Sequence, residues 1–160
     1  MAFFRRSRFE QISPHAYSVK LAAHERETIA FLIPQLRELL EEAPTNDPRL
    51  RRLFPTTYTT DPQAELEYQR LMRDDLVKSR LSSLDILQAN LSATTLSEGD
   101  LVRWMQAVND ARLVLGTILD VSEDDDRYNI DESDPDFEAV MLFEYLGDLL
   151  QDIVVALSPP

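Results

Sequence analysis

Cysteine is absent from this chain of 160 residues, and glycine and histidine are scarce. Without cysteine there is no disulfide framework, no thiolate metal site and no thiol redox sensor built from this chain alone. The three glycines do not form a phosphate-binding loop, and no GxSxG motif marks a nucleophile. The two histidines, His15 and His24, lack the spacing of a zinc-binding helix. We therefore expect no cofactor, no metal site and no catalytic residues, and hence a protein that is not an enzyme.

Long hydrophobic runs are also missing, and none of the apolar stretches could cross a bilayer. The N-terminal stretch MAFFRRSRF carries arginine from position 5 and has no apolar core segment. We therefore expect no signal peptide, no membrane contact and a cytoplasmic location. The length predicts a single domain over 1–160, with a hairpin over 1–21 and a helical bundle over 22–160.

The net charge of the chain is −13, and its acids concentrate in a predicted loop over 120–136. This loop lacks the glycine and one oxygen ligand of an EF-hand, so its pattern is typical of a solvated loop. A net anion repels the phosphates of nucleic acids. A helix-turn-helix over 81–110 would also place more acids than arginines in its second helix. We therefore expect no direct binding to DNA.

Hydrophobic periodicity predicts a mainly α-helical fold, with a bundle of about four main helices and a short N-terminal β-hairpin. Alternating apolar residues predict the hairpin strands over 3–11 and 16–21. Apolar residues spaced by three and four predict helices, and Asp-Pro pairs favour the starts of several segments. The four predicted helices cover residues 23–42, 62–91, 97–119 and 135–157.

Three details of these helices lead to further expectations. Pro34 should bend or divide the first helix, because proline removes one backbone hydrogen bond. The apolar stripe of the second helix shifts near 79–83, which predicts a kink or a change of packing partner there. Gly116 costs about 1 kcal/mol relative to alanine within a helix, so we expect a tight helix crossing at that position.

The last predicted helix has an apolar face that is broader than a surface helix needs. Either it lies at the centre of the bundle or it forms the seam of a homodimer. The residues of this stripe are Phe143, Leu146, Leu150, Ile153 and Leu157. Both interpretations remain open from the sequence, and we lean towards the homodimer.

Lysine is nearly absent, since 14 of the 16 basic residues are arginine, which favours bidentate pairs with carboxylates. We hypothesise that Arg49 or Arg52 pairs with an interior carboxylate and fixes the connector 44–62 across the bundle. The residues considered for such ion pairs are Arg49, Arg52, Asp74, Asp75, Asp110 and Arg112. If the three aspartates instead lined an open pocket without arginine, they would favour an enzyme.

A second basic group lies in the predicted hairpin, where FFRRSRF alternates aromatic and arginine residues. Arg5, Arg6 and Arg8 form a candidate patch for an anion or for a protein partner. The alternative interpretation is that these charges protect an edge strand from pairing with another sheet.

Three strings define a resemblance to a known family, and it covers nearly the whole chain. They are DPRLRRLFPTTY at 47–58, DDL at 74–76 with RLSSLDIL at 80–87, and NDARLVLGTILDV at 109–121. These strings resemble a family of small actinobacterial proteins described as a domain of unknown function. The family includes the oxidative-stress transcriptional regulator AosR, and its genes often lie next to that of the protease adaptor ClpS.

The resemblance implies a non-enzymatic regulatory module that acts through protein partners such as a sigma factor or RNA polymerase. The alternative that it suggests is an accessory factor of ClpS and Clp proteolysis, and a carboxylate-based enzyme or metal binder comes third. It supplies no catalytic residues. Because the chain has no cysteine, an oxidative stress signal would have to be sensed by a partner.

Overall fold

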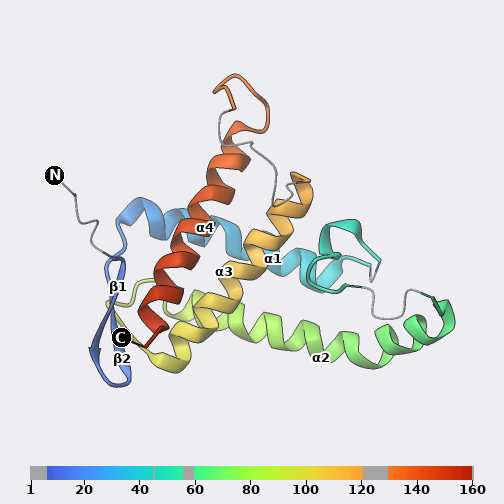
Figure 1. Cartoon of the computed structure of the whole chain (residues 1–160), viewed down its shortest axis with the longest axis horizontal. Coiled ribbons are helices and arrows are strands. Elements are labelled where there is room, and N and C mark those ends of the chain that lie inside the picture. Colours follow the sequence, from blue (N-terminus) through green and yellow to red (C-terminus); the bar gives the residue numbers. More distant parts are fainter. Residues whose placement is uncertain (1–6, 45, 56–59, 121–129, 160) are drawn as a thin grey trace.

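A computed structural model describes residues 7–44, 46–55, 60–120 and 130–159 of the chain. The described elements confirm the predicted fold class, because four long helices accompany a small antiparallel sheet at the N-terminal side (Figure 1). In chain order the elements are β1 (Phe9–Ser13), β2 (Ala16–Val19), α1 (Ala23–Glu42), the 3-10 turn η1 (Pro48–Leu50), α2 (Pro62–Ala89), β3 (Thr95–Ser97), α3 (Glu98–Ile118) and α4 (Phe137–Leu157).

Helices α1, α2 and α3 begin beside side chains that accept hydrogen bonds from backbone N–H groups. At α2 the Asp61 carboxylate accepts from the Ala64 N–H, and at α3 the Ser97 hydroxyl accepts from the Asp100 N–H. At α1 the Glu25 carboxylate accepts from the Ala22 N–H. Helix α1 continues through Pro34 without interruption, so the expected division of this helix does not occur.

The sheet contains one strand that the sequence pattern did not predict. The strand order is β1-β2-β3, with Phe9 opposite Val19 and Tyr17 opposite Leu96. These four side chains are buried and place one face of the sheet on the helices. Strand β3 lies directly before α3, so it connects the N-terminal strands to the start of a central helix.

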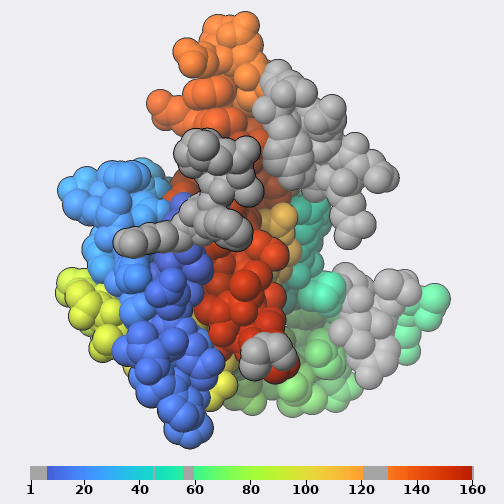
Figure 2. Space-filling view, turned by 60° about the vertical axis from the view of Figure 1, so that its left-hand side comes forward, coloured from blue at the N-terminus to red at the C-terminus, as the bar shows by residue number. Residues whose placement is uncertain are grey.

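The hydrophobic core is built around α3 and α4, which lie side by side (Figure 1). Trp104 of α3 is completely buried, and the Phe9 ring meets it edge-on at 6.0 Å between centroids. The N-terminal strands lie beside α4 in the space-filling view (Figure 2). The core therefore joins the first and last described elements of the chain.

The broad apolar stripe of α4 packs inside the chain. Leu146 and Ile153 are almost completely buried, Phe143 is buried, and Leu150 and Leu157 are partly buried against the same core. Contacts within the chain cover much of this stripe, which favours a central bundle helix, while a homodimer seam through these five residues stays a prediction.

The helix crossing at Gly116 is as close as expected. A Cβ atom at this position would lie 2.9 Å from the Phe143 ring of α4 and 2.9 Å from the Arg52 guanidinium. Real Cβ contacts are not this short, so the absence of a side chain lets α4 and the 48–54 turn approach α3. This approach buries Leu50, Leu53 and Phe54.

Candidate interaction surface

The three arginines of the 48–54 turn contact different parts of the chain. The Arg49 guanidinium pairs with Asp47 at 2.7 Å, and its side chain is about half exposed. Arg51 lies 3.3 Å from the exposed carboxylate of Asp120. Arg52 approaches Gly116 of α3. Thus Arg49 takes a neighbour in sequence as its partner, and the expected pair with an interior carboxylate is not formed by this residue.

The interior carboxylate that we singled out, Asp110, pairs with an arginine that the sequence analysis did not consider. Asp110 is 2% exposed, and its Oδ1 lies 2.5 Å from Nη1 of Arg80 on α2. Arg80 also donates to the Leu53 carbonyl at 3.3 Å, so it joins α2, α3 and the 48–54 turn. Burial raises the pKa of Asp110, although the positive charge of Arg80 opposes this effect.

The other three candidates for ion pairing do not gather around Asp110. Asp74 and Asp75 are exposed on α2, and neither has an ion-pair partner among the described residues. The Arg112 guanidinium lies over the Phe143 ring, 4.7 Å from its centroid. Arg112 therefore makes a cation–π contact, and no carboxylate in the described part of the chain pairs with it.

Arg8 is the described member of the predicted N-terminal patch, while Arg5 and Arg6 lie outside the described residues. Its Nε donates to Glu25 at 2.6 Å, and its Nη1 donates to Asp152 at 2.8 Å and lies 3.8 Å from Asp148. The Tyr145 hydroxyl donates to Glu25 at 3.3 Å. Arg8 directly precedes β1, so these bonds tie the start of the sheet to α1 and α4. Its side chain is only 15% exposed and has little surface left for a free anion.

The carboxylate and the phenol beside Arg8 respond to burial in different ways. Burial alone would raise the pKa of Glu25, but hydrogen bonds from the Ala22 N–H and from Arg8 hold that pKa below its usual value. Burial and the neighbouring Glu25 charge raise the pKa of Tyr145 well above its usual value. This network therefore holds Glu25 ionised and Tyr145 protonated.

Helical spacing contained a signal for both of the residues that we overlooked. Arg80 precedes the buried Leu84 by four positions and Leu87 by seven, which places it on the inner face of α2. Glu25 precedes the buried Ile29 by four positions on α1. A charged residue in phase with an apolar stripe indicates a buried partner of opposite charge.

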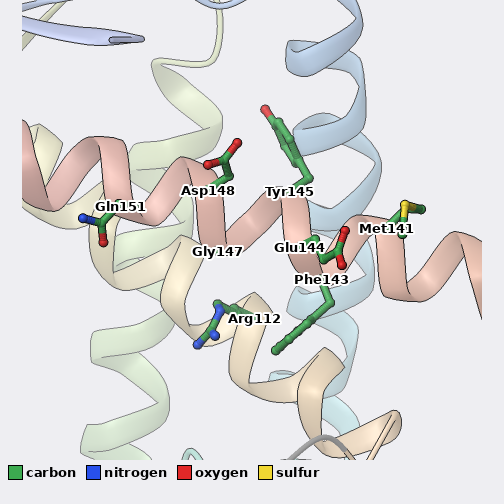
Figure 3. Close-up of a pocket in the computed structure, with 8 residues that line it drawn as sticks. All are labelled: Arg112, Met141, Phe143, Glu144, Tyr145, Gly147, Asp148 and Gln151. Carbon is green, nitrogen blue, oxygen red and sulfur yellow. The ribbon is translucent and has the colours of Figure 1, made fainter. Parts of the chain in front are cut away.

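An open groove runs along the outer side of α4 and has a volume of about 680 Å³ (Figure 3). We call this surface the α4 groove. Its lining residues are Arg112, Met141, Phe143, Glu144, Tyr145, Gly147, Asp148 and Gln151. Arg112 comes from α3, and all the others come from α4.

Gly147 contributes to the shape of the α4 groove. In Figure 3, Arg112 and Phe143 project to one side of α4, while Tyr145 and Asp148 project to the other. Gly147 lies between these two groups, and a Cβ atom there would come within 3.2 Å of the Arg112 Nε. The bare backbone at Gly147 thus lets Arg112 lie across the helix, next to Phe143.

The described residues contain no group of three or more histidine, aspartate or glutamate side chains that could hold a metal ion. Within the same parts of the chain, no helix combines the length and the apolar character that crossing a membrane requires. Comparison with solved structures gave no significant match.

Comparison with known proteins identifies the family. A Mycobacterium leprae (strain TN) protein that bears the provisional name oxidative stress regulator AosR is 36% identical over 92 residues. The match takes in 47% of this chain and 42% of the relative, so it spans less than half of either protein. The family model described as a domain of unknown function (DUF2017) matches residues 1–157. This match confirms the resemblance that the sequence motifs indicated, and the chain therefore belongs to the DUF2017 family.

Proposed function

We propose that this protein is a non-enzymatic regulator of a stress response and that it acts by contact with other proteins. The observation that carries the proposal is that arginine neutralises Glu25 and Asp110, the two acids that are buried in the described part of the chain. Asp110 pairs with Arg80 and Glu25 pairs with Arg8, so both carboxylates serve to hold elements together. Acids held in this way are poorly suited to act as general bases or metal ligands.

The placement of the aspartates supports this proposal over a carboxylate enzyme. An enzyme would need Asp74, Asp75 and Asp110 to converge on one cavity without an arginine between them. Asp110 is instead buried against Arg80, while Asp74 and Asp75 are exposed on α2. The α4 groove contains Glu144 and Asp148, but it is open to solvent along the helix.

We propose stress regulation in particular because of the name of the relative. The name of the Mycobacterium leprae protein assigns it to oxidative stress regulation, and the family model covers nearly all of this chain. We extend that assignment to a transcription-linked role in the cytoplasm, with a sigma factor or RNA polymerase as the partner. Because this chain has no cysteine, the partner would detect the oxidant.

The test is a pull-down with the tagged full-length chain and purified partners from the same organism. RNA polymerase core, sigma factors and Clp components including ClpS are offered separately at equal concentration. Retention of polymerase or a sigma factor is the expected result. Retention of Clp components alone would replace this proposal with a role in regulated proteolysis, and retention of none would remove it.

A gel shift with generic duplex DNA separates contact with proteins from contact with nucleic acid. At low salt the electrostatic attraction of any basic patch to DNA is strongest. We expect no shift for the full-length chain, because its net charge is −13. A salt-sensitive shift would instead assign the regulatory role to DNA binding.

A further inference from the structure

We propose that two copies of this chain form a dimer in which the exposed first turns of α2 pack against each other in antiparallel orientation. This inference goes beyond the proposed function, because it concerns contact between copies and needs no other protein. Four observations carry it: these turns bury no residue, they expose leucine, the charges on one of their faces balance, and the order of these residues makes the face complementary to itself.

The first turns of α2 extend beyond α1, α3 and α4 (Figure 1). None of the side chains from Pro62 to Met72 is buried, and the first buried residue of α2 is Arg73. The Arg73 guanidinium lies 3.9 Å from the centroid of the Phe54 ring, so α2 meets the body of the protein at this point. We call residues 62–72 the α2 extension.

The α2 extension presents apolar side chains that the chain itself leaves in water. Leu66 is 67% exposed and Leu71 is 64% exposed. Helices in proteins gain most of their stability by packing an apolar face against another element, and about three turns of helix are marginal without such packing. A second helix laid along the extension would supply this contact and remove both leucines from water.

An open groove with a volume of about 630 Å³ runs along the same part of α2. The described residues that line it all belong to α2, and they include Leu66, Glu67, Arg70 and Asp74. Because the described wall is a single helix, the groove has room for another helix beside it. This groove therefore places the contact on the side of α2 that carries Glu67 and Arg70.

The order of the residues makes this side of the helix complementary to itself. Residues 66–71 read LEYQRL. Two antiparallel copies can be related by a two-fold axis at the middle of this string. Leu66 of one copy then lies level with Leu71 of the other, and Glu67 of one copy lies level with Arg70 of the other. The axis repeats each of these pairs, so the dimer contains two leucine pairs and two ion pairs.

The four side chains of these pairs share one side of the helix. At about 100° per residue they span roughly 140° of the helix surface, and their order around it is Leu66, Arg70, Glu67 and Leu71. The two charges therefore lie in the middle of the contact, and one leucine flanks them on either side. Side chains at the same level would then interlock across the two helices, as knobs do in holes.

The charges of this face are available for a second copy. Glu67 and Arg70 are exposed, and neither forms an ion pair with another described residue. Because one acid and one base balance each other, the face gains little from a strongly basic protein or from the phosphates of a nucleic acid. A surface that carries the same two charges in reverse order is the better match, and a second copy supplies it.

The size of the contact sets its strength. Two extensions that meet over about three turns bury less than the roughly 1,200 Å² of a stable interface. We therefore expect a weak dimer that exchanges with monomers and forms as the concentration rises.

Sedimentation equilibrium of the full-length chain measures the dissociation constant of this dimer. The chain is compared between about 10 μM and 1 mM, at about 150 mM salt, and the dimer fraction should rise over this range. L66A/L71A should raise the dissociation constant about tenfold or more, because it removes both leucine pairs. Circular dichroism should show unchanged helix content, because alanine favours helix and both leucines are exposed.

Charge reversals test the antiparallel register. E67R sets two guanidinium groups level with each other, and R70E does the same with two carboxylates. Because the two-fold axis counts each change twice, either variant alone should raise the dissociation constant about tenfold. A mixture of E67R and R70E again pairs opposite charges at both places. We expect mixed dimers in this mixture with about the dissociation constant of the wild type.

Two control variants make the same changes in net charge elsewhere on α2. D75R changes the net charge from −13 to −11, as E67R does, because one acid becomes one base. K78E changes it from −13 to −15, as R70E does. Both residues are exposed and lie beyond the LEYQRL string. Each control should change the dissociation constant less than about twofold, and mixing the two controls should bring no gain.

Four results would overturn the inference. A wild type that stays monomeric at about 1 mM would remove the dimer. Equal weakening by E67R and D75R would show an effect of net charge alone. A mixture of E67R and R70E without mixed dimers would remove the antiparallel register. A dimer that none of these variants weakens would have its contact elsewhere, for example at the apolar stripe of α4.

Discussion

Nη1 of Arg80 lies 2.5 Å from Oδ1 of Asp110, and this ion pair joins two helices at a position where the carboxylate is 2% exposed. Such a pair holds the fold in register, but it contributes less net stability than its short distance implies, because both charges lose water. The contribution of this pair to stability can therefore be measured only when Arg80 and Asp110 are substituted both separately and together.

Removing Arg80 should cost more than removing the charge of Asp110. R80M leaves a buried carboxylate without a cation, and we expect a loss of about 3–5 kcal/mol in the free energy of unfolding. D110L should cost less, because the remaining guanidinium is 28% exposed and reaches water. R80M/D110L should recover most of the loss. Urea denaturation of the four proteins measures this cycle, and strictly additive losses would contradict the pairing.

The two interior glycines of α3 and α4 should respond differently to alanine. G116A gains helix propensity, but its Cβ atom would lie 2.9 Å from the buried Phe143 ring, so we expect a net loss of about 1–3 kcal/mol. G147A meets only the Arg112 side chain, at 3.2 Å, which can move. Its stability should stay within about 1 kcal/mol of the wild type. Thermal denaturation compares the two, and an unchanged G116A would argue against the tight crossing.

The Arg8–Glu25 contact should make stability depend on acid pH. The pKa of Glu25 is held below its usual value of 4.5, so its carboxylate stabilises the fold above about that pH. This contribution is lost as the pH falls through the lowered pKa. We expect E25Q to lose about 1.5–3 kcal/mol at pH 7, as for other charged hydrogen bonds, and to lose less at pH 3. Urea midpoints at both pH values test this, and an equal loss at both would contradict it.

A polar residue in the α4 stripe should unfold the chain rather than dissociate a dimer. Ile153 is completely buried, so I153D should remove more than about 4 kcal/mol and abolish cooperative unfolding. Val155 is 57% exposed on the same helix, and V155D should be nearly neutral. Circular dichroism measures whether each variant is folded, and light scattering measures its mass. A folded I153D protein with half the mass of the wild type would support the seam interpretation.

The positions of the helices could be predicted from the sequence because the signals for their starts and buried faces are local. Asp61 and Ser97 cap α2 and α3 as their residue types predict, and the apolar stripes lie on the buried faces. Strand β3 was not predicted, because its three residues are too few to show an alternation of apolar and polar side chains. Its pairing with β2 depends on where the chain returns after α2, which no local pattern encodes.

The presence of ion pairs in the interior was easier to predict than the residues that form them. The excess of arginine indicated ion pairs, and Asp110 does pair with an arginine. Which residue of α2 meets Asp110 depends on how α2 is rotated against α3. Arg80 and Asp75 lie on different faces of α2, so different rotations would bring different side chains to Asp110. Likewise, the choice between core and dimer seam for α4 depends on which surfaces the other elements cover.

Arg8 and Asp152 are bonded although 144 positions separate them. On a ribosome, Arg8 emerges long before Asp152 is synthesised, so the first strand cannot reach its final attachment while the chain is growing. Completion of the fold must then wait for release of the last helix, and a message truncated before that helix would yield a product whose first strand lacks this anchor.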